Sequence, residues 1–253
     1  MLLAEDLLLL LTDDTTGRLA VPGAPADAGL GGAVLAELAL MGKVDLTGEA
    51  DPGKPWRLAV YDSSPAGDAV LDAALAIVLA HEGKKPSAVI KPLGKHLRQT
   101  LHGRLVDRGV LRAEQARILG IFPAHRWPAL DTSHEEQVRQ QLAAALTGQA
   151  APDSRTAALV ALLYALRCEH KVVDPRPYGI SRGQLRARAE EIAMDSWVSA
   201  AVRQVIETSQ GGPSLARSQS YSKLGRKAPQ QALARLYVAA GQGSGGHIQT
   251  SEG

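Results

Sequence analysis

The residues best suited to chemistry are the basic side chains of a stretch that runs from residue 84 to residue 126. It holds ten lysine and arginine residues against two acids, a local charge of +8 (10 − 2), whereas the 253-residue chain carries a formal net charge of only +2. Charge concentrated in this way usually has a partner, and the candidates are phosphates of a nucleic acid or of a membrane surface. A solvated basic face that only keeps the protein soluble is the alternative.

Three residues of this stretch are spaced to share one face of a helix. Residues 95–108 are predicted to be helical, so Lys95, Arg98 and His102 stand at positions i, i+3 and i+7. Lysine offers a point charge and arginine can bind phosphate oxygens bidentately, so the three side chains suit one multivalent anion. We therefore predict a site for one multivalent anion, a phosphate of a lipid or of a nucleic acid, at Lys95, Arg98 and His102.

A β-hairpin is predicted to follow this helix, because residues 118–130 form two apolar arms around a short turn. Phe122 and Trp127 lie near its expected tip, where they can pack inward or form an exposed apolar patch. As an exposed patch, Phe122 and Trp127 would contact a protein partner or a bilayer, so membrane contact is one of the expectations for them. A basic helix followed by a hairpin also imitates a winged helix, so a nucleic-acid-binding protein that uses residues 95–130 is the alternative function. Pro92 and Gly94 disfavour nucleic acid as the partner, because they break the helix that should precede the recognition helix.

The residues that could support catalysis have simpler structural explanations. Asp68 and Asp72 could act as paired carboxylates, but each also suits a position near a helix N-terminus. The sequence has no P-loop, dinucleotide-binding fingerprint or nucleophile elbow, and Val138 stands where a zinc-protease motif needs its second histidine. We expect a protein that is not an enzyme and has no cofactor and no metal.

The elements that must position these residues are mostly helices. Leucine and alanine dominate a chain with 45% hydrophobic and only 4% aromatic residues, which favours a mainly α fold. A short accessory β-hairpin is expected to pair residues 43–47 with residues 56–61. Helices are predicted at 3–11, 29–41, from a Ser64 cap to about 79, and at 95–108, 133–146 and 155–170. A last pair of helical patterns, capped by Ser181, is predicted over residues 184–207.

Composition divides the chain into two parts. Residues 1–207 are predicted to form a single helical domain, and residues 208–253 a flexible basic tail, in which five basic residues are opposed only by Glu252. No segment has the roughly 18 uninterrupted apolar residues of a transmembrane helix. The lone Cys168 fits a reducing compartment. We expect a cytoplasmic protein in which any contact with a membrane is peripheral.

Five blocks of the sequence together resemble the Golgi phosphoprotein 3 family, in a bacterial form. They occur in the family's order and span about residues 3–207. The blocks are Glu5–Leu11 with the following Asp-Asp and Gly, Gly32–Val44, Asp62–Asp68 with Leu71-Asp72, Leu97–Leu111, and Arg155–Leu159.

The resemblance implies a mostly helical domain with a protruding β-hairpin that serves membrane contact and self-association. It also implies a peripheral membrane protein, because the eukaryotic members bind phosphatidylinositol 4-phosphate and act as adaptors for Golgi membrane proteins. In those members the headgroup pocket uses a Trp, an Arg and two further basic residues. The last two correspond to Lys95 and Arg98, whereas Gly31 stands in place of the Arg and the neighbourhood of Pro22 offers no Trp.

Overall fold

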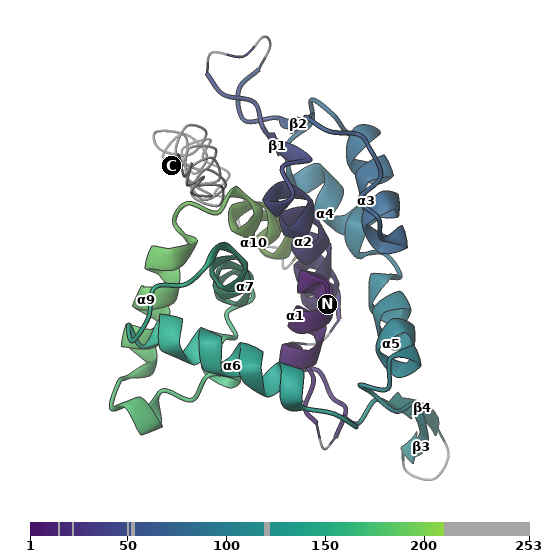
Figure 1. Ribbon diagram of the computed structural model, residues 1–253, viewed down its shortest axis with the longest axis vertical. Helices are drawn as coiled ribbons and strands as arrows, with labels where there is room; N and C mark the ends of the chain where they lie inside the picture. The colour runs from purple at the N-terminus through teal and green to yellow at the C-terminus, as the bar shows by residue number, and fades with distance from the viewer. Residues whose placement is uncertain (15, 22, 50, 52–53, 119–121, 210–253) are drawn as a thin grey trace, which may run out of the picture.

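The computed structural model describes residues 1–209 apart from 15, 22, 50, 52–53 and 119–121, and it omits the side chains of 115–126 (Figure 1). The described part is mainly helical, as predicted. It also contains a 3₁₀ turn at Arg176–Tyr178. The α-helices are α1 (Leu3–Leu11), α2 (Ala24–Leu40), α3 (Ala69–Leu79), α4 (Ser87–Gly94), α5 (Leu97–Asp107), α6 (Ser133–Leu146), α7 (Ser154–Ala165), α8 (Glu169–Val172), α9 (Arg182–Ala193) and α10 (Trp197–Ser209).

Helix α2 lies at the centre of the molecule and contacts α1, α4, α7 and α10 (Figure 1). Its crossing with α4 is unusually close, because two glycines meet there. A Cβ atom added to Gly31 would lie 2.4 Å from the carbonyl oxygen of Ile90, and one added to Gly94 would lie 2.2 Å from that of Asp27. The two backbones are therefore in direct contact, and neither position has room for a side chain.

Helix α1 is buried on every side. All nine of its residues are buried, including the two carboxylates of Glu5 and Asp6. The other seven residues of α1 are leucine or alanine, and such a helix belongs in a core, since an exposed face would leave hydrocarbon in water. The acids can lie there only because basic side chains from distant parts of the chain reach them.

Two antiparallel hairpins project from opposite ends of the helical body (Figure 1). The accessory hairpin pairs β1 (Val44–Leu46) with β2 (Leu58–Val60), as predicted. The second pairs β3 (Glu114–Ile118) with β4 (Phe122–Arg126), and Arg117 lies opposite Pro123. This hairpin begins about four residues earlier than predicted.

Helices α2 and α3 each begin several residues away from the predicted start. Helix α2 starts at Ala24 rather than Gly29, because Pro25 fits the first helical turn, where its missing N–H is not needed. Helix α3 starts at Ala69, capped by Asp68, whose carboxylate accepts a hydrogen bond from the Val70 N–H at 2.9 Å. The predicted cap Ser64 instead accepts a hydrogen bond from the Lys43 ammonium.

The predicted helix over residues 95–108 is interrupted at its start. Lys95 is the C-terminal cap of α4, and His96 adopts a left-handed conformation with φ 60° before α5 begins at Leu97. Lys95 therefore lies outside the helix that carries Arg98 and His102. The i, i+3, i+7 arrangement predicted for the three residues is wrong.

The basic tail lies outside the described residues from position 210 onward.

Within the described part, no helix is both long and apolar enough to cross a bilayer. No group of three or more His, Cys, Asp or Glu side chains in that part could hold a metal ion.

Candidate anion-binding site

Two arginines of the basic stretch, Arg104 and Arg108, pair with the buried Glu5 of α1. Arg104 donates to Glu5 at 2.8 Å and to both carboxylate oxygens of Asp68 at 2.7 and 3.0 Å. Arg108 donates to Glu5 at 2.9 Å. Burial alone would raise the pKa of Asp68, but the bonds from Arg104 and from the Val70 backbone outweigh it and hold that pKa below its ordinary value. These guanidinium groups stabilise the fold and are not available to a ligand.

A second ionic cluster forms around Asp6, the other buried acid of α1. Arg155 donates to Asp6 at 2.8 Å and to Glu37 at 3.0 Å, and His134 contacts the second oxygen of Asp6 at 2.8 Å. These acids and Arg155 come from three of the sequence blocks that resemble the Golgi phosphoprotein 3 family. The blocks therefore supply a buried ionic network as well as core leucines.

The placement of His102 corrects its predicted role. His102 is 7% exposed, and its ring stacks on Trp127 with centroids 4.5 Å apart and planes inclined by 8°. Burial, with a smaller contribution from the charge of Arg98, lowers its pKa from 6.5 to about 4, so the ring is neutral at pH 7. A neutral, stacked side chain inside the protein is not placed to bind a lipid phosphate.

The position of Trp127 also differs from the predicted one. It follows the end of β4 and packs against the hydrophobic core, so it lies at the base of the hairpin rather than at its tip. Phe122 is the first residue of β4, opposite Ile118, and its side chain lies outside the described part. Membrane contact at Phe122 therefore stays a prediction.

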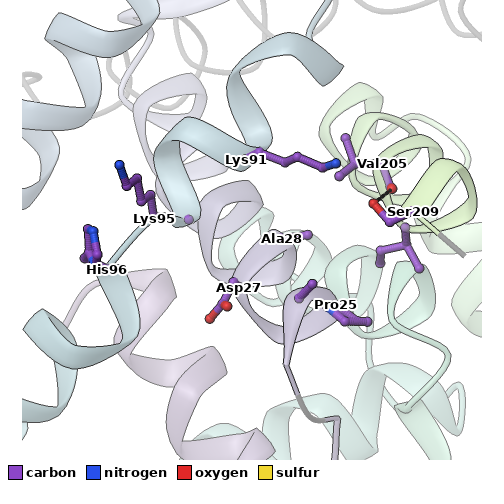
Figure 2. A pocket seen from close by; sticks show the side chains of 11 residues that line it. Pro25, Asp27, Ala28, Lys91, Lys95, His96, Val205 and Ser209 are labelled. Atoms are coloured by element: carbon purple, nitrogen blue, oxygen red, sulfur yellow. Dashed lines mark hydrogen bonds between the residues drawn. The ribbon is translucent and has the colours of Figure 1, made fainter.

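A pocket of about 600 Å³ lies between the first turn of α2, the C-terminal end of α4 and the last turn of α10 (Figure 2). We call it the first pocket. Lys91 extends from α4 toward Val205 and Ser209, and Lys95 and His96 lie on the opposite side of the view (Figure 2). The lining residues are Ala24, Pro25, Asp27, Ala28, Lys91, Gly94, Lys95, His96, Val205, Ile206 and Ser209.

The charges of the first pocket suit an anion. Lys91 and Lys95 are exposed, and neither forms an ion pair with a described residue. Arg98, the other predicted ligand, lies at the edge of the pocket with its Nε 3.5 Å from a carboxylate oxygen of Asp27. The structure thus brings Lys95 and Arg98 to one region, whereas the ring of His102 is buried against Trp127.

Sequence reasoning missed Lys91, His96 and Asp27. The spacing of Lys91 and Lys95, four residues apart, is a signal that could have found the first of them, because such residues lie on one helix face. His96 and Asp27 carry no comparable signal. Their place in the pocket depends on the left-handed residue between α4 and α5 and on the contact between α2 and α4.

Gly31, which stands in place of a family arginine, cannot carry a side chain in this fold because α4 occupies that space. The cations of this pocket therefore come from α4 and from the junction of α4 with α5. In this respect the site is built differently from the pocket that the family resemblance implies.

The winged-helix alternative has little support in the structure. Arg104 and Arg108, two of the arginines of the predicted recognition helix, are paired with the buried acids, and Arg112 is paired with Glu114. A DNA-binding helix needs its cations in solvent, where phosphates can reach them.

Comparisons with known proteins agree with the architecture. The family model for Golgi phosphoprotein 3 (GPP34) matches residues 3–209, from α1 to the end of α10. The vacuolar protein sorting-associated protein 74 of Eremothecium gossypii is 28% identical over an alignment 165 residues long, which covers 57% of this chain and 48% of that relative. The aligned part is therefore about half the length of that relative. Because the family match covers most of the sequence, the chain belongs to the Golgi phosphoprotein 3 (GPP34) family.

Proposed function

We propose that this protein is a peripheral membrane protein, not an enzyme, that binds the headgroups of anionic phospholipids in the first pocket. One observation carries the proposal: the ammonium groups of Lys91 and Lys95 stand unpaired, among the described residues, beside a largely apolar pocket. Lys91 and Lys95 lie on two sides of this pocket (Figure 2), and a largely apolar pocket with a few polar groups is typical of a ligand site. Membership of the family makes phosphatidylinositol 4-phosphate the first lipid to test.

Arg98 is the third ligand in this proposal. Its weak pairing with Asp27, at 3.5 Å, can be replaced by a bidentate contact with a phosphate. The β3–β4 hairpin is the proposed second contact with the membrane and the proposed site of self-association, with Phe122 as its apolar residue.

Vesicle co-sedimentation tests the function directly. Vesicles of phosphatidylcholine alone are compared with vesicles that also contain phosphatidylinositol 4-phosphate or phosphatidylglycerol. The double variant Lys91→Ala/Lys95→Ala is expected to bind anionic vesicles about 30-fold more weakly, at ~1 kcal/mol for each basic residue lost near an anionic surface.

The matched control is Lys84→Ala/Lys85→Ala, which removes the same charge at two exposed positions outside the pocket. It is expected to bind within about threefold of the unmodified protein. Equal losses in the two double variants would mean that diffuse charge, and not the pocket, binds the membrane. Equal binding to neutral and anionic vesicles would refute the proposed function.

A further inference from the structure

A second pocket, of about 410 Å³, adjoins the first, since Pro25 and Ile206 line both. Three basic side chains meet in it from three separate elements. Arg167 comes from the turn after α7, Lys171 from α8 and Arg203 from α10. With Glu207 as the acid of its lining, the pocket carries a formal charge of +2 (3 − 1).

The arginines of this pocket lack the ion pairs that most other arginines form in the described part of the chain. Nine described arginines form ion pairs with carboxylates. Arg167 and Arg203 form none with a described residue, and Glu207 does not pair with Arg203, although it lies four residues further along α10. Lys171 donates to the carbonyl oxygen of Ala20 at 2.8 Å, which leaves two of its three donors for a ligand.

The backbone at Arg167 is a second, independent observation. Arg167 follows the C-terminal cap of α7 and has a φ of 55°, a left-handed conformation that glycine adopts most easily at this place. Among the described residues other than glycine, positive φ occurs at Trp56, His96 and Arg167. Each of the two adjoining pockets thus contains one such residue, and such conformations gather at ligand sites, where the side chain is needed despite the strain.

Arg203 is held in place before any ligand arrives. Its Cζ lies 5.3 Å from the ring centroid of Tyr164, and its Nη1 lies 3.4 Å from the Tyr164 hydroxyl oxygen. A guanidinium fixed against an aromatic ring loses less freedom when it binds a planar set of phosphate oxygens. Arg203 lines the second pocket together with Arg167 and Lys171.

We propose that the second pocket binds the phosphate group of a second anionic lipid, through Arg167, Lys171 and Arg203. This inference rests on the proposed function, because a membrane held at the first pocket brings lipid phosphates to its neighbour. Two adjoining weak sites on one membrane bind together more tightly than either alone, since the second binding event takes place at a high effective concentration. Membrane binding should therefore rise with about the second power of the anionic lipid fraction.

The test measures binding to vesicles over a range of phosphatidylglycerol contents. Arg167→Gly removes a charge while it suits the backbone at that position, so it is expected to keep the fold and to weaken binding about fivefold. Arg203→Gln is expected to act in the same direction, and both should reduce the dependence on lipid fraction to about the first power. Glu207→Gln is expected to strengthen binding about threefold. Arg182→Ala, at an exposed position outside both pockets, is the matched control and should bind like the unmodified protein.

The outcomes separate this inference from the proposed function. Normal, second-power binding by Arg167→Gly and Arg203→Gln, together with loss of binding in Lys91→Ala/Lys95→Ala, would overturn the second site and leave the first. Normal binding by Lys91→Ala/Lys95→Ala would overturn the proposed function itself. Calorimetric titration with glycerol 3-phosphate, without vesicles, distinguishes the source of the phosphate. Suppose that the unmodified protein binds glycerol 3-phosphate, that Arg167→Gly abolishes this binding, and that the same variant binds vesicles normally. That result would assign the pocket to a soluble phosphate and overturn the assignment to a lipid.

Discussion

Asp27 is the one acid in the lining of the first pocket, among the described residues. Its negative charge repels the proposed anionic ligand. Asp27→Asn is expected to bind anionic vesicles about three- to fivefold more tightly, because it removes a negative charge and frees Arg98 from its contact at 3.5 Å. Loss of an acid from the first turn of α2 should cost only about 0.5 kcal/mol of stability. Vesicle binding and chemical denaturation measure the two effects.

The control for this substitution is Glu191→Gln, which removes an exposed acid paired with Arg188 outside both pockets. It should leave vesicle binding unchanged. Weaker or unchanged binding by Asp27→Asn would show that the anion does not approach this end of α2.

His102 should make stability depend on pH. Its pKa is lowered by burial from 6.5 to about 4 in the folded protein, so the folded state binds fewer protons than the unfolded state between these values. This contribution to stability is complete above pH 6.5 and is lost as the pH falls through 4, with a total on the order of 3 kcal/mol. Denaturation midpoints measured across this range should therefore fall toward acid.

His102→Phe is the comparison, because phenylalanine keeps an aromatic ring against Trp127 but does not titrate. The variant should lose less stability than the unmodified protein between pH 6.5 and pH 4. Parallel pH curves for the two proteins would contradict a neutral, buried His102.

At the scale of residues, the sequence indicated which side chains are basic but not which are already paired. Arg104 looks like a ligand as much as Lys95 does, yet its partners Glu5 and Asp68 lie 99 and 36 residues away. His102 illustrates the same limit. Its spacing from Arg98 is helical, but whether that face is exposed depends on Trp127, which lies beyond the hairpin.

At the scale of elements, the contact between α2 and α4 fixes the geometry of the first pocket. Gly31→Ala should destabilise the protein by about 2 kcal/mol, because its Cβ would lie 2.4 Å from the Ile90 oxygen and 2.8 Å from the Gly94 nitrogen, both of them backbone atoms. Urea denaturation measures the loss. Anionic vesicle binding should weaken with it, since α4 carries Lys91 and Lys95 is its cap.

Gly103→Ala in α5 is the matched glycine control. An added Cβ there meets no atom within 4 Å, so this change should be neutral or should stabilise the helix by up to about 1 kcal/mol. Similar behaviour of the two glycine variants would mean that α2 and α4 do not approach each other this closely.

The pattern of the sequence predicted most elements because each depends on local signals. Apolar periodicity located α1, α6, α7 and α10, and turn residues located both hairpins. The start of α2 was missed because Pro25 permits either a loop or a first helical turn, and packing against α4 selects the helix. The start of the β3–β4 hairpin was missed because the sequence Glu-Gln-Ala-Arg, which has high helix propensity, forms part of its first strand.

At the scale of the whole molecule, the basic tail should add to membrane attraction without adding to the fold. Residues 210–253 carry five basic residues and one acid, and they begin next to Ser209 in the lining of the first pocket. Removing them should leave the denaturation midpoint unchanged and weaken binding to anionic vesicles roughly tenfold or more at low salt. Co-sedimentation at two salt concentrations measures the effect.

A full-length variant with the five tail bases changed to glutamine separates charge from length. It should bind like the truncated protein if charge is responsible. Binding like the unmodified protein would show that tail charge plays no part.

The buried acids of α1 also decide when this protein can complete its fold during synthesis. Asp6 is 149 residues from Arg155 along the chain, and Glu5 is 99 residues from Arg104. At the usual 5–20 residues per second, a ribosome needs roughly 7–30 s to reach Arg155 after it has made α1. During that interval the leucine-rich helix has neither its apolar neighbours nor the cations that neutralise its carboxylates. The nascent chain should therefore need a chaperone at its first helix, and ribosome-bound chains that end before Arg155 should crosslink to one through α1.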